Sequence, residues 1–534
     1  MKKYFTLYVI FVLILSIISI INFSISFAQT IDTSQKSENV TNSSTLLDSI
    51  PVTTTPIKYI VVIFQENNSF DHYFATYPNS ENQEGESTFI PLKDTPSVNG
   101  LTEGLIMNNT NLVKPYRLEP SFATKIAECG NNHTYTAIQR SLNSGLMNKF
   151  VQYSGQDYGN CDSAQVMGYF DGNTVTALWN YAQHYAMSDS FHSSILGPSL
   201  PGHLNLISGQ THGASPSNIE DLVINGSVID DLDSFYDDCS EGQTISLDGK
   251  NIGDLLNKKN ITWGWFQGGF KPTNWVSEDN NSTKNRKAEC NSSHQNIVGK
   301  NITDYVVHHE PFQYYRSTSN PHHLPPSAVH MIGHTDQANH QYDISDFWNA
   351  LDTQNIPYIS FLKPPAYQNG HSGYSDPFDE QVFITSTINR LQESPEWNEM
   401  AIIIAYDDSG GWYDHEMPPI IMNSDLPGYD LLSGADLLCD TSPDEKSYDG
   451  RCGYGLRLPM LVISPFSKEN YVSHHVIDQS SIIKFIEDNW QLGEIGDLSF
   501  DSIAGSINDM FNFSTGHDSG KLQLDKFTGQ LSSN

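Results

Sequence analysis

The chain contains few basic residues. Of its 534 residues only 28 are Lys or Arg, whereas 62 are Asp or Glu, which gives a formal net charge of −34. A protein without basic surface cannot displace the counterions of a nucleic-acid backbone, so we expect no nucleic-acid partner. A phosphorylated small molecule stays open as a substrate, because one bound metal ion reverses the local charge of a site.

Long apolar segments are also absent after the first 28 residues, so no later part of the sequence is predicted to span a membrane. Near the start, two lysines precede an apolar run over 4–23, and the Ser-Phe-Ala sequence at 26–28 has the pattern of a cleavage site. We predict a secretory signal peptide over 1–28. The apolar run is long enough to span a bilayer, so an uncleaved anchor is the alternative. In both cases we expect a secreted or outward-facing protein.

Cysteine is scarce as well. The six cysteines include no Cys-x-x-Cys pair, which argues against a zinc knuckle or a thioredoxin-like redox site. An even number in an exported chain favours disulfides, although sequence alone does not fix their pairing. Sequential pairing is our working hypothesis, because the last two cysteines bracket one polar loop. It gives Cys129–Cys161, Cys239–Cys290 and Cys439–Cys452.

The chain divides by composition. Residues 29–55 are rich in Ser, Thr and Asn and are predicted to form a disordered stalk. A domain follows over 56–515, and a polar tail over 516–534. The 38% hydrophobic fraction is sufficient for a sizeable core. Asn-x-Ser/Thr sequons are potential glycan sites and therefore surface positions; examples are Asn39, Asn225, Asn260, Asn291 and Asn301.

Short apolar runs alternate with helix-like segments along the domain. Several runs are continuous rather than alternating, which is typical of parallel strands covered on both faces. They lie at 57–64, 261–266, 357–362, 400–406 and 460–466, and helical patterns cover 378–394 and 478–490. This order predicts an α/β layered sandwich. The stretch 267–345 is rich in Asn, His and Ser, and we expect it to form long loops over one edge.

Acidic and amide side chains follow two of the apolar runs. Glu66-Asn67 comes shortly after 57–64, and Asp407-Asp408 comes directly after 400–406. Ligands gather at the carboxyl ends of parallel strands, and hard cations prefer carboxylate and carbonyl oxygens. We therefore predict a divalent-metal site there. Taken singly, the first pair could cap a helix and the second could form a solvated turn.

Ser199 follows a Gly-Pro turn and precedes a helical pattern. A hydroxyl at a helix start lies beside free N–H groups and a partial positive charge, which together favour a phosphoryl oxygen. Taken alone, Ser199 is more simply explained as a helix N-cap. Histidines gather at His133, at His308-His309 and at His371. Such side chains can hold phosphoryl oxygens or protonate a leaving group.

These segments together resemble the phosphoesterase family of bacterial-type phospholipases C and secreted acid phosphatases, within the alkaline phosphatase superfamily. The resemblance runs from about residue 57 to residue 514. It is carried by VVIFQENNSFDHYFATYP (61–78), MGYFDG (167–172), DSFHSSILGPSLPGHLNLISGQTHG (189–213), HHEPFQYY (308–315), FLKPPAYQNGHSGYSDP (361–377), AIIIAYDDSGGWYDH (401–415) and LRLPMLVISPFSK (456–468). It implies an alkaline phosphatase-like, three-layer α/β/α sandwich with a mostly parallel central sheet and long loop insertions.

The resemblance also implies roles for the candidate residues. The metal ligands would be Glu66, Asn67, Asp407 and Asp408; the nucleophile would be Ser199; and the phosphate pocket would be lined by Asn67, His133, His308, His309 and His371. Two positions depart from the family pattern. Pro201-Gly202-His203 stands where the family often has Pro-Asn-Arg, which leaves lipid specificity open. Asp407-Asp408 replaces an Asp-Glu pair and keeps two carboxylates.

The expected function is a secreted, metal-dependent phosphoric ester hydrolase, of phospholipase C or acid phosphatase type, that forms a phosphoseryl intermediate. Its substrate would be a phospholipid or a phosphomonoester, and contact with a membrane surface is compatible with this. Two alternatives remain. A sulfatase is suggested by Ser199-Leu200-Pro201, but His203 stands where sulfatases have Arg. A non-catalytic cell-surface glycoprotein would suit the stalk and sequons, whereas the complete set of site residues argues against it.

Overall fold

The computed structural model describes residues 51–155, 161–277, 286–421, 424, 428–432, 448–514 and 519–532. The predicted signal peptide and most of the predicted stalk lie outside these residues. The end of that stalk is attached to the domain, because the backbone N–H groups of Thr54 and Thr55 donate to Asn489. Within the described part of the chain, no helix combines the length and apolar character needed to cross a membrane.

A central sheet carries the fold. Its eight strands, in spatial order, are β16 (Gln341–Asp343), β11 (Trp263–Gln267), β17 (Ile359–Lys363), β1 (Tyr59–Gln65), β18 (Met400–Tyr406), β19 (Met460–Ile463), β4 (Ala186–Ser188) and β20 (Tyr471–Ser473). Neighbouring strands are parallel except at β19, which runs antiparallel to both β18 and β4. The prediction of a mostly parallel sheet is therefore confirmed.

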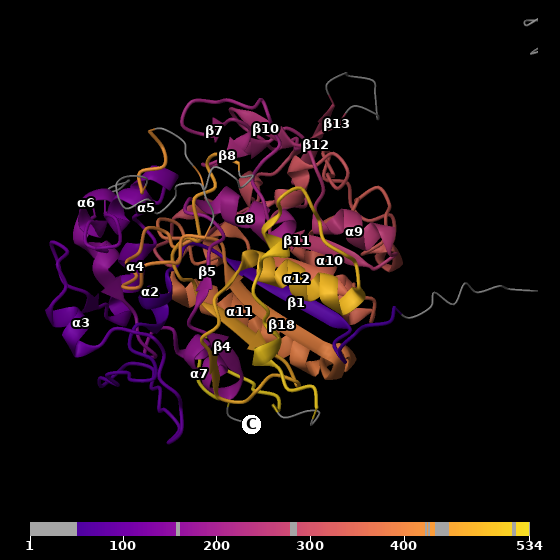
Figure 1. The fold of residues 1–534 in the computed structure, drawn as a ribbon. Helices are drawn as coiled ribbons and strands as arrows, with labels where there is room; N and C mark the ends of the chain where they lie inside the picture. Colours follow the sequence, from indigo (N-terminus) through magenta and orange to yellow (C-terminus); the bar gives the residue numbers. More distant parts are fainter. Residues whose placement is uncertain are drawn as a thin grey trace, which may run out of the picture. The chain divides into compact units, whose positions relative to one another are not determined.

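One face of the sheet is covered by a pair of helices. The ring of Phe64 in β1 meets the ring of His203 in α8 (Ser199–Ser208) edge-on, with 5.0 Å between centroids. The helix α12 (Gln479–Trp490) packs against α8 (Figure 1). Every residue of α8 is buried. This explains why its sequence lacks the polar stripe of a surface helix.

Other helices cover the opposite face. The ring of Phe266 in β11 packs against α10 (Ile344–Asp352), and the Tyr406 hydroxyl at the end of β18 donates to Glu380 of α11 (Pro377–Glu393). With helices on both faces, the central strands have no solvated side. This is the physical reason for their continuous apolar sequences, and the predicted three-layer sandwich is confirmed.

The predicted elements agree with the observed ones to within two or three residues, apart from one strand. The run at 460–466 is predicted as another parallel strand, but β19 ends at Ile463 and is antiparallel. The short strands β4, β16 and β20 have no counterpart in the prediction, because three residues give no usable periodicity. The described part of the stretch 267–345 consists largely of loops, with short strands and 3-10 turns, and it leads from β11 to the edge strand β16.

Two of the three hypothesised disulfides are present, Cys129–Cys161 and Cys239–Cys290, and no cysteine in the described part of the chain is free. Cys439 lies outside the described residues. The polar tail packs back on the domain, because Leu524 is buried and its carbonyl oxygen accepts a 2.7 Å hydrogen bond from Asn389 of α11.

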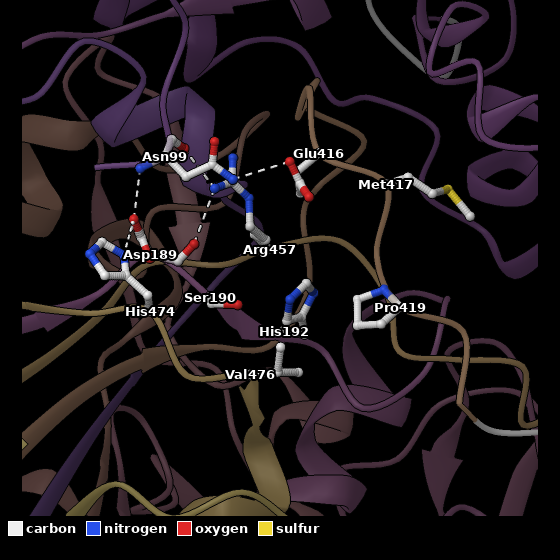
Figure 2. Close-up of a pocket in the computed structure, with 10 residues that line it drawn as sticks. All are labelled: Asn99, Asp189, Ser190, His192, Glu416, Met417, Pro419, Arg457, His474 and Val476. Carbon is white, nitrogen blue, oxygen red and sulfur yellow. Dashed lines mark hydrogen bonds and ion pairs between the residues drawn. The ribbon is translucent and has the colours of Figure 1, made fainter. Parts of the chain in front are cut away.

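A buried arginine joins the segments that follow β1 and β18. Arg457 donates to the carboxylates of Asp71 and Asp414, at 3.0–3.2 Å, and to the carbonyl oxygens of Asn99 and Asp189. Figure 2 shows this arginine in the wall of a pocket of about 310 Å³. Asp71 belongs to α2 (Phe70–Phe74), and Asp414 follows the turn after β18, so one guanidinium holds both segments.

We expect Arg457→Gln to lower the free energy of unfolding by about 3–5 kcal/mol, because it removes the guanidinium from two buried carboxylates, of which Asp414 has no other ion-pair partner among the described residues. The matched control is Arg390→Gln, whose partner Asp352 is largely exposed. Since surface ion pairs contribute little, this control should change stability by about 1 kcal/mol or less. Urea unfolding of both variants measures the difference, and equal losses would contradict the assigned role of Arg457.

Candidate active site

The two acidic segments lie side by side at the carboxyl edge of the sheet. β1 and β18 are parallel neighbours, with Gln65 opposite Tyr406 at their ends. Glu66-Asn67 and Asp407-Asp408 are the next residues of each strand, and all four side chains are buried. The structure therefore brings the two predicted pairs together at one edge of the sheet.

The turns after the two strands interlock. Asn67 has the left-handed φ of 55°, and its N–H donates to Asp407 Oδ1 at 2.7 Å. The N–H of Asp408 donates to the same oxygen at 2.7 Å. A Cβ at Gly410 would lie 2.2 Å from the Asn67 carbonyl oxygen, so only glycine fits there. The residue that caps the following helix is Ser69, which rules out a capping role for Glu66 or Asn67.

Ser199 points into this acidic set. It is the first residue of α8, and the N-cap is Pro198. Its Oγ lies 3.1 Å from Glu66 Oε2, 3.2 Å from Asp408 Oδ2 and 3.3 Å from Asn67 Oδ1. One hydroxyl hydrogen can satisfy only one of three acceptors at a time. The simple N-cap interpretation of Ser199 is therefore wrong, and the hydroxyl belongs to the oxygen-rich site.

Close packing brings α8 to this position. A Cβ at Gly202 would lie 2.3 Å from the Asp407 carbonyl oxygen, so the helix approaches the turn after β18 as closely as glycine permits. The N–H of Leu200 donates to Asp231 Oδ1 at 2.8 Å, which satisfies one of the free donors of the first turn. The departure from the family pattern at Gly202 thus accompanies a tight helix–loop contact.

The carboxylates of the site oppose one another's ionisation. Burial raises the pKa of Glu66 well above its usual range, and the charge of Asp407 adds to this, while Lys363 acts in the opposite direction. Burial and Asp407 also raise the pKa of Asp408 well above its usual range. Asp407 Oδ2 is buried and has no hydrogen-bond partner among the described residues. Converging carboxylate and amide oxygens of this kind fit a hard divalent cation.

His133 orients Asn67. Its Nδ1 lies 2.8 Å from the Asn131 carbonyl oxygen, which can only accept, so Nδ1 carries the proton. His133 Nε2 then accepts from Asn67 Nδ2 at 3.0 Å, which turns Asn67 Oδ1 towards Ser199. The ring of His371 stands edge-on to that of His133, with 5.8 Å between centroids. Burial, followed by the effect of His133, lowers the pKa of His371 well below its usual value.

His308 and His309 differ in their surroundings. His309 is buried, and its Nε2 lies 3.4 Å from Glu66 Oε2. Burial lowers the pKa of His309 well below its usual value, and Lys363 lowers it further. His308 is partly exposed, and its Nε2 lies 3.9 Å from Asp231 Oδ2. Of the four predicted histidines, His133 and His309 contact the acidic set directly, whereas the rings of His371 and His308 pack against those of His133 and His309. Of the adjacent pair, His308 is the one with access to solvent.

Two residues of the site are missing from the prediction. Lys363 is the last residue of β17, and its ammonium group pairs with Glu66 Oε1. His203 lies one helical turn after Ser199, and its Nε2 is 3.3 Å from Glu66 Oε1. The strand-exit argument used for Glu66 applies equally to Lys363, so a signal for it was present. His203 could have been found from its helical spacing to Ser199.

Solved structures resemble this chain only distantly. Murine ectonucleotide pyrophosphatase/phosphodiesterase 5 aligns with 63% of this chain and 95% of its own, at 10% identity and a TM-score of 0.32. A phosphonate monoester hydrolase from Silicibacter pomeroyi aligns with 64% of this chain and 73% of its own, at 12% identity and a TM-score of 0.29.

Sequence relatives are more informative. The non-hemolytic phospholipase C of Pseudomonas aeruginosa is 24% identical over 467 residues, which cover 86% of this chain and 57% of that protein. Phospholipase C A of Mycobacterium tuberculosis is 22% identical over 465 residues, which cover 86% and 78%. The chain thus spans little more than half the length of the Pseudomonas relative. The Phosphoesterase family model matches residues 57–493, which include every predicted site residue, and the chain belongs to the Phosphoesterase family.

Proposed function

We propose that this protein is a divalent-metal-dependent hydrolase of phosphoric esters with Ser199 as its nucleophile. The observation that supports this best is the position of Ser199 Oγ, within 3.3 Å of oxygens from Glu66, Asn67 and Asp408, at the first turn of α8. Membership of the Phosphoesterase family and the phospholipase C names of the relatives support the same reaction class.

Glu66, Asn67, Asp407 and Asp408 would hold the metal ion. The fit rests on the converging oxygens and on Asp407 Oδ2, which is buried and accepts no hydrogen bond from the residues that the structure describes. A bound divalent ion draws negative charge from the phosphoryl oxygens and lowers the pKa of a neighbouring hydroxyl. Oxygen ligands of this kind suit several hard cations.

The protein groups account for the remaining steps. The Ser199 hydroxyl loses its proton to a carboxylate already within hydrogen-bond reach, and Oγ forms a bond to phosphorus while the ester P–O bond breaks. The free N–H groups at the start of α8 favour the phosphoryl oxygens. His308, with access to solvent, donates a proton to the leaving alcohol. Water then attacks the phosphoseryl group, which releases phosphate or a phosphomonoester and restores the hydroxyl.

The names of the relatives favour a phospholipid as substrate, with a phosphomonoester as the alternative. A secreted protein fits the two disulfides. It also fits four exposed sequon asparagines, Asn225, Asn260, Asn291 and Asn301. Rates of hydrolysis of p-nitrophenyl phosphate and p-nitrophenyl phosphorylcholine, compared on one preparation, separate the two substrate classes.

Replacement of Ser199 tests the nucleophile. Ser199→Ala should lower turnover by several orders of magnitude, because it removes the atom that attacks phosphorus while the ligands and histidines stay in place. The free energy of unfolding should change by about 1 kcal/mol or less. Ser199→Thr, which keeps a hydroxyl, is the matched control and should retain part of the activity. Mass spectrometry of acid-quenched turnover should find phosphate on the peptide that carries Ser199. Near-normal turnover of Ser199→Ala would overturn the assignment.

Removal of the metal tests the role of the acidic set. Prolonged chelation and dialysis should abolish hydrolysis, and a divalent cation should restore it, because the buried carboxylates need a cation to offset their repulsion. Asp408→Asn should weaken metal binding, measured by isothermal titration. Full activity in a preparation that contains no metal by elemental analysis would disprove metal dependence and leave the Ser199 assignment to be judged by its own test.

A further inference from the structure

Glu66 has a second group of neighbours besides Ser199. The ammonium group of Lys363 pairs with Glu66 Oε1, His203 Nε2 lies 3.3 Å from the same oxygen, and His309 Nε2 lies 3.4 Å from Oε2. All four side chains are buried, with at most 1% of any of them exposed. Glu66 therefore stands between the predicted metal site on one side and a lysine with two imidazoles on the other.

The proton positions of His203 can be assigned from its partners. Its Nδ1 lies 2.8 Å from the Ser199 carbonyl oxygen, which can only accept, so Nδ1 carries the proton and Nε2 presents a lone pair. That lone pair faces a carboxylate oxygen, and two acceptors at 3.3 Å need a positive charge beside them. The ammonium group of Lys363, on the same oxygen, supplies this charge.

The same atoms form a ligand set for a metal ion. The rings of His203 and His309 are nearly parallel, at 7° with 5.1 Å between centroids, and both present Nε2 to Glu66. Neither Nε2 has a hydrogen-bond partner in the described part of the chain. One ligand atom from each of Glu66, His203 and His309 lies within 4.8 Å of the others. Two imidazole nitrogens and a carboxylate are ligands that suit zinc better than magnesium or calcium.

We propose that the ammonium group of Lys363 takes the place of a second divalent cation at Glu66, His203 and His309. A lysine nitrogen is a fixed positive charge that neither exchanges with the medium nor needs ligands in a set geometry. It pairs with Glu66 Oε1, the oxygen that His203 Nε2 also faces, and so occupies one edge of the ligand set. The inference rests on the proposed function only in that Glu66 is shared with the proposed metal site.

Zinc content tests the proposal on the purified full-length chain. Lys363→Met keeps a long unbranched side chain and removes the charge. After equilibration with Zn²⁺ and removal of free metal, elemental analysis should find one more zinc per chain in Lys363→Met than in the wild type. Lys363→Arg is the matched control and should show no additional zinc. Adding His203→Asn to Lys363→Met should remove the additional ion, whereas His203→Asn alone should leave the wild-type zinc content unchanged.

A spectroscopic measurement tests the same additional metal site and does not depend on an activity assay. Co²⁺ in place of Zn²⁺ should give Lys363→Met an additional visible absorption band that depends on His203. Equal zinc contents of wild type and Lys363→Met, both with native circular dichroism, would overturn the proposal, as would a His203-dependent second zinc in the wild type. If Lys363→Met does not fold, Lys363→Gln replaces it. If the wild type binds no ion, the proposed metal site fails, while the difference between the two proteins still decides the role of Lys363.

Discussion

Repulsion between buried carboxylates is the constraint on which the site depends. Glu66, Asp407 and Asp408 converge at the ends of two adjacent strands, and each has a separate compensation. Asp407 Oδ1 accepts two backbone N–H groups, Glu66 pairs with Lys363, and Asp408 accepts from Gly410 and lies within reach of the Ser199 hydroxyl. An unpaired buried charge lowers stability far more than a paired one. These contacts therefore stabilise the buried carboxylates and also hold the turns around them in place.

The backbone meets this constraint by packing closely. Gly202 and Gly410 allow the first turn of α8 and the turn after β1 to approach the residues after β18, and Asn67 adopts a left-handed conformation that asparagine tolerates better than most residues. Arg457 then holds the next part of both segments through Asp71 and Asp414. The site is therefore built on strand ends and a buried helix, with an ion-pair network behind it, and such rigid support keeps reacting groups in place.

The sequence predicts what depends on local pattern and misses what depends on tertiary contact. Continuous apolar runs identify the long central strands, because burial on both faces leaves a signal within each segment. The direction of β19 has no such signal, since a parallel and an antiparallel buried strand have the same composition. Glu66 and Asp407 stand out as acids at the ends of apolar runs. Lys363 occupies the same kind of position, but its meaning depends on a partner far away in the chain. The orientation of Asn67 by His133 likewise depends on a hydrogen bond that no spacing reveals.

The net charge of −34 makes positive charge within the site important for binding a negatively charged substrate. A phosphate ester approaches this protein against its overall field, but at physiological ionic strength that field is screened over about 8 Å. Binding therefore depends on positive charge within the site itself: the partial charge at the start of α8, the ammonium group of Lys363 and, in the proposed mechanism, a metal ion. The same reasoning favours a substrate with little net charge. A zwitterionic phosphodiester headgroup is repelled less by an acidic surface than a doubly charged phosphomonoester, so the composition of the whole chain favours the first of these two classes of substrate.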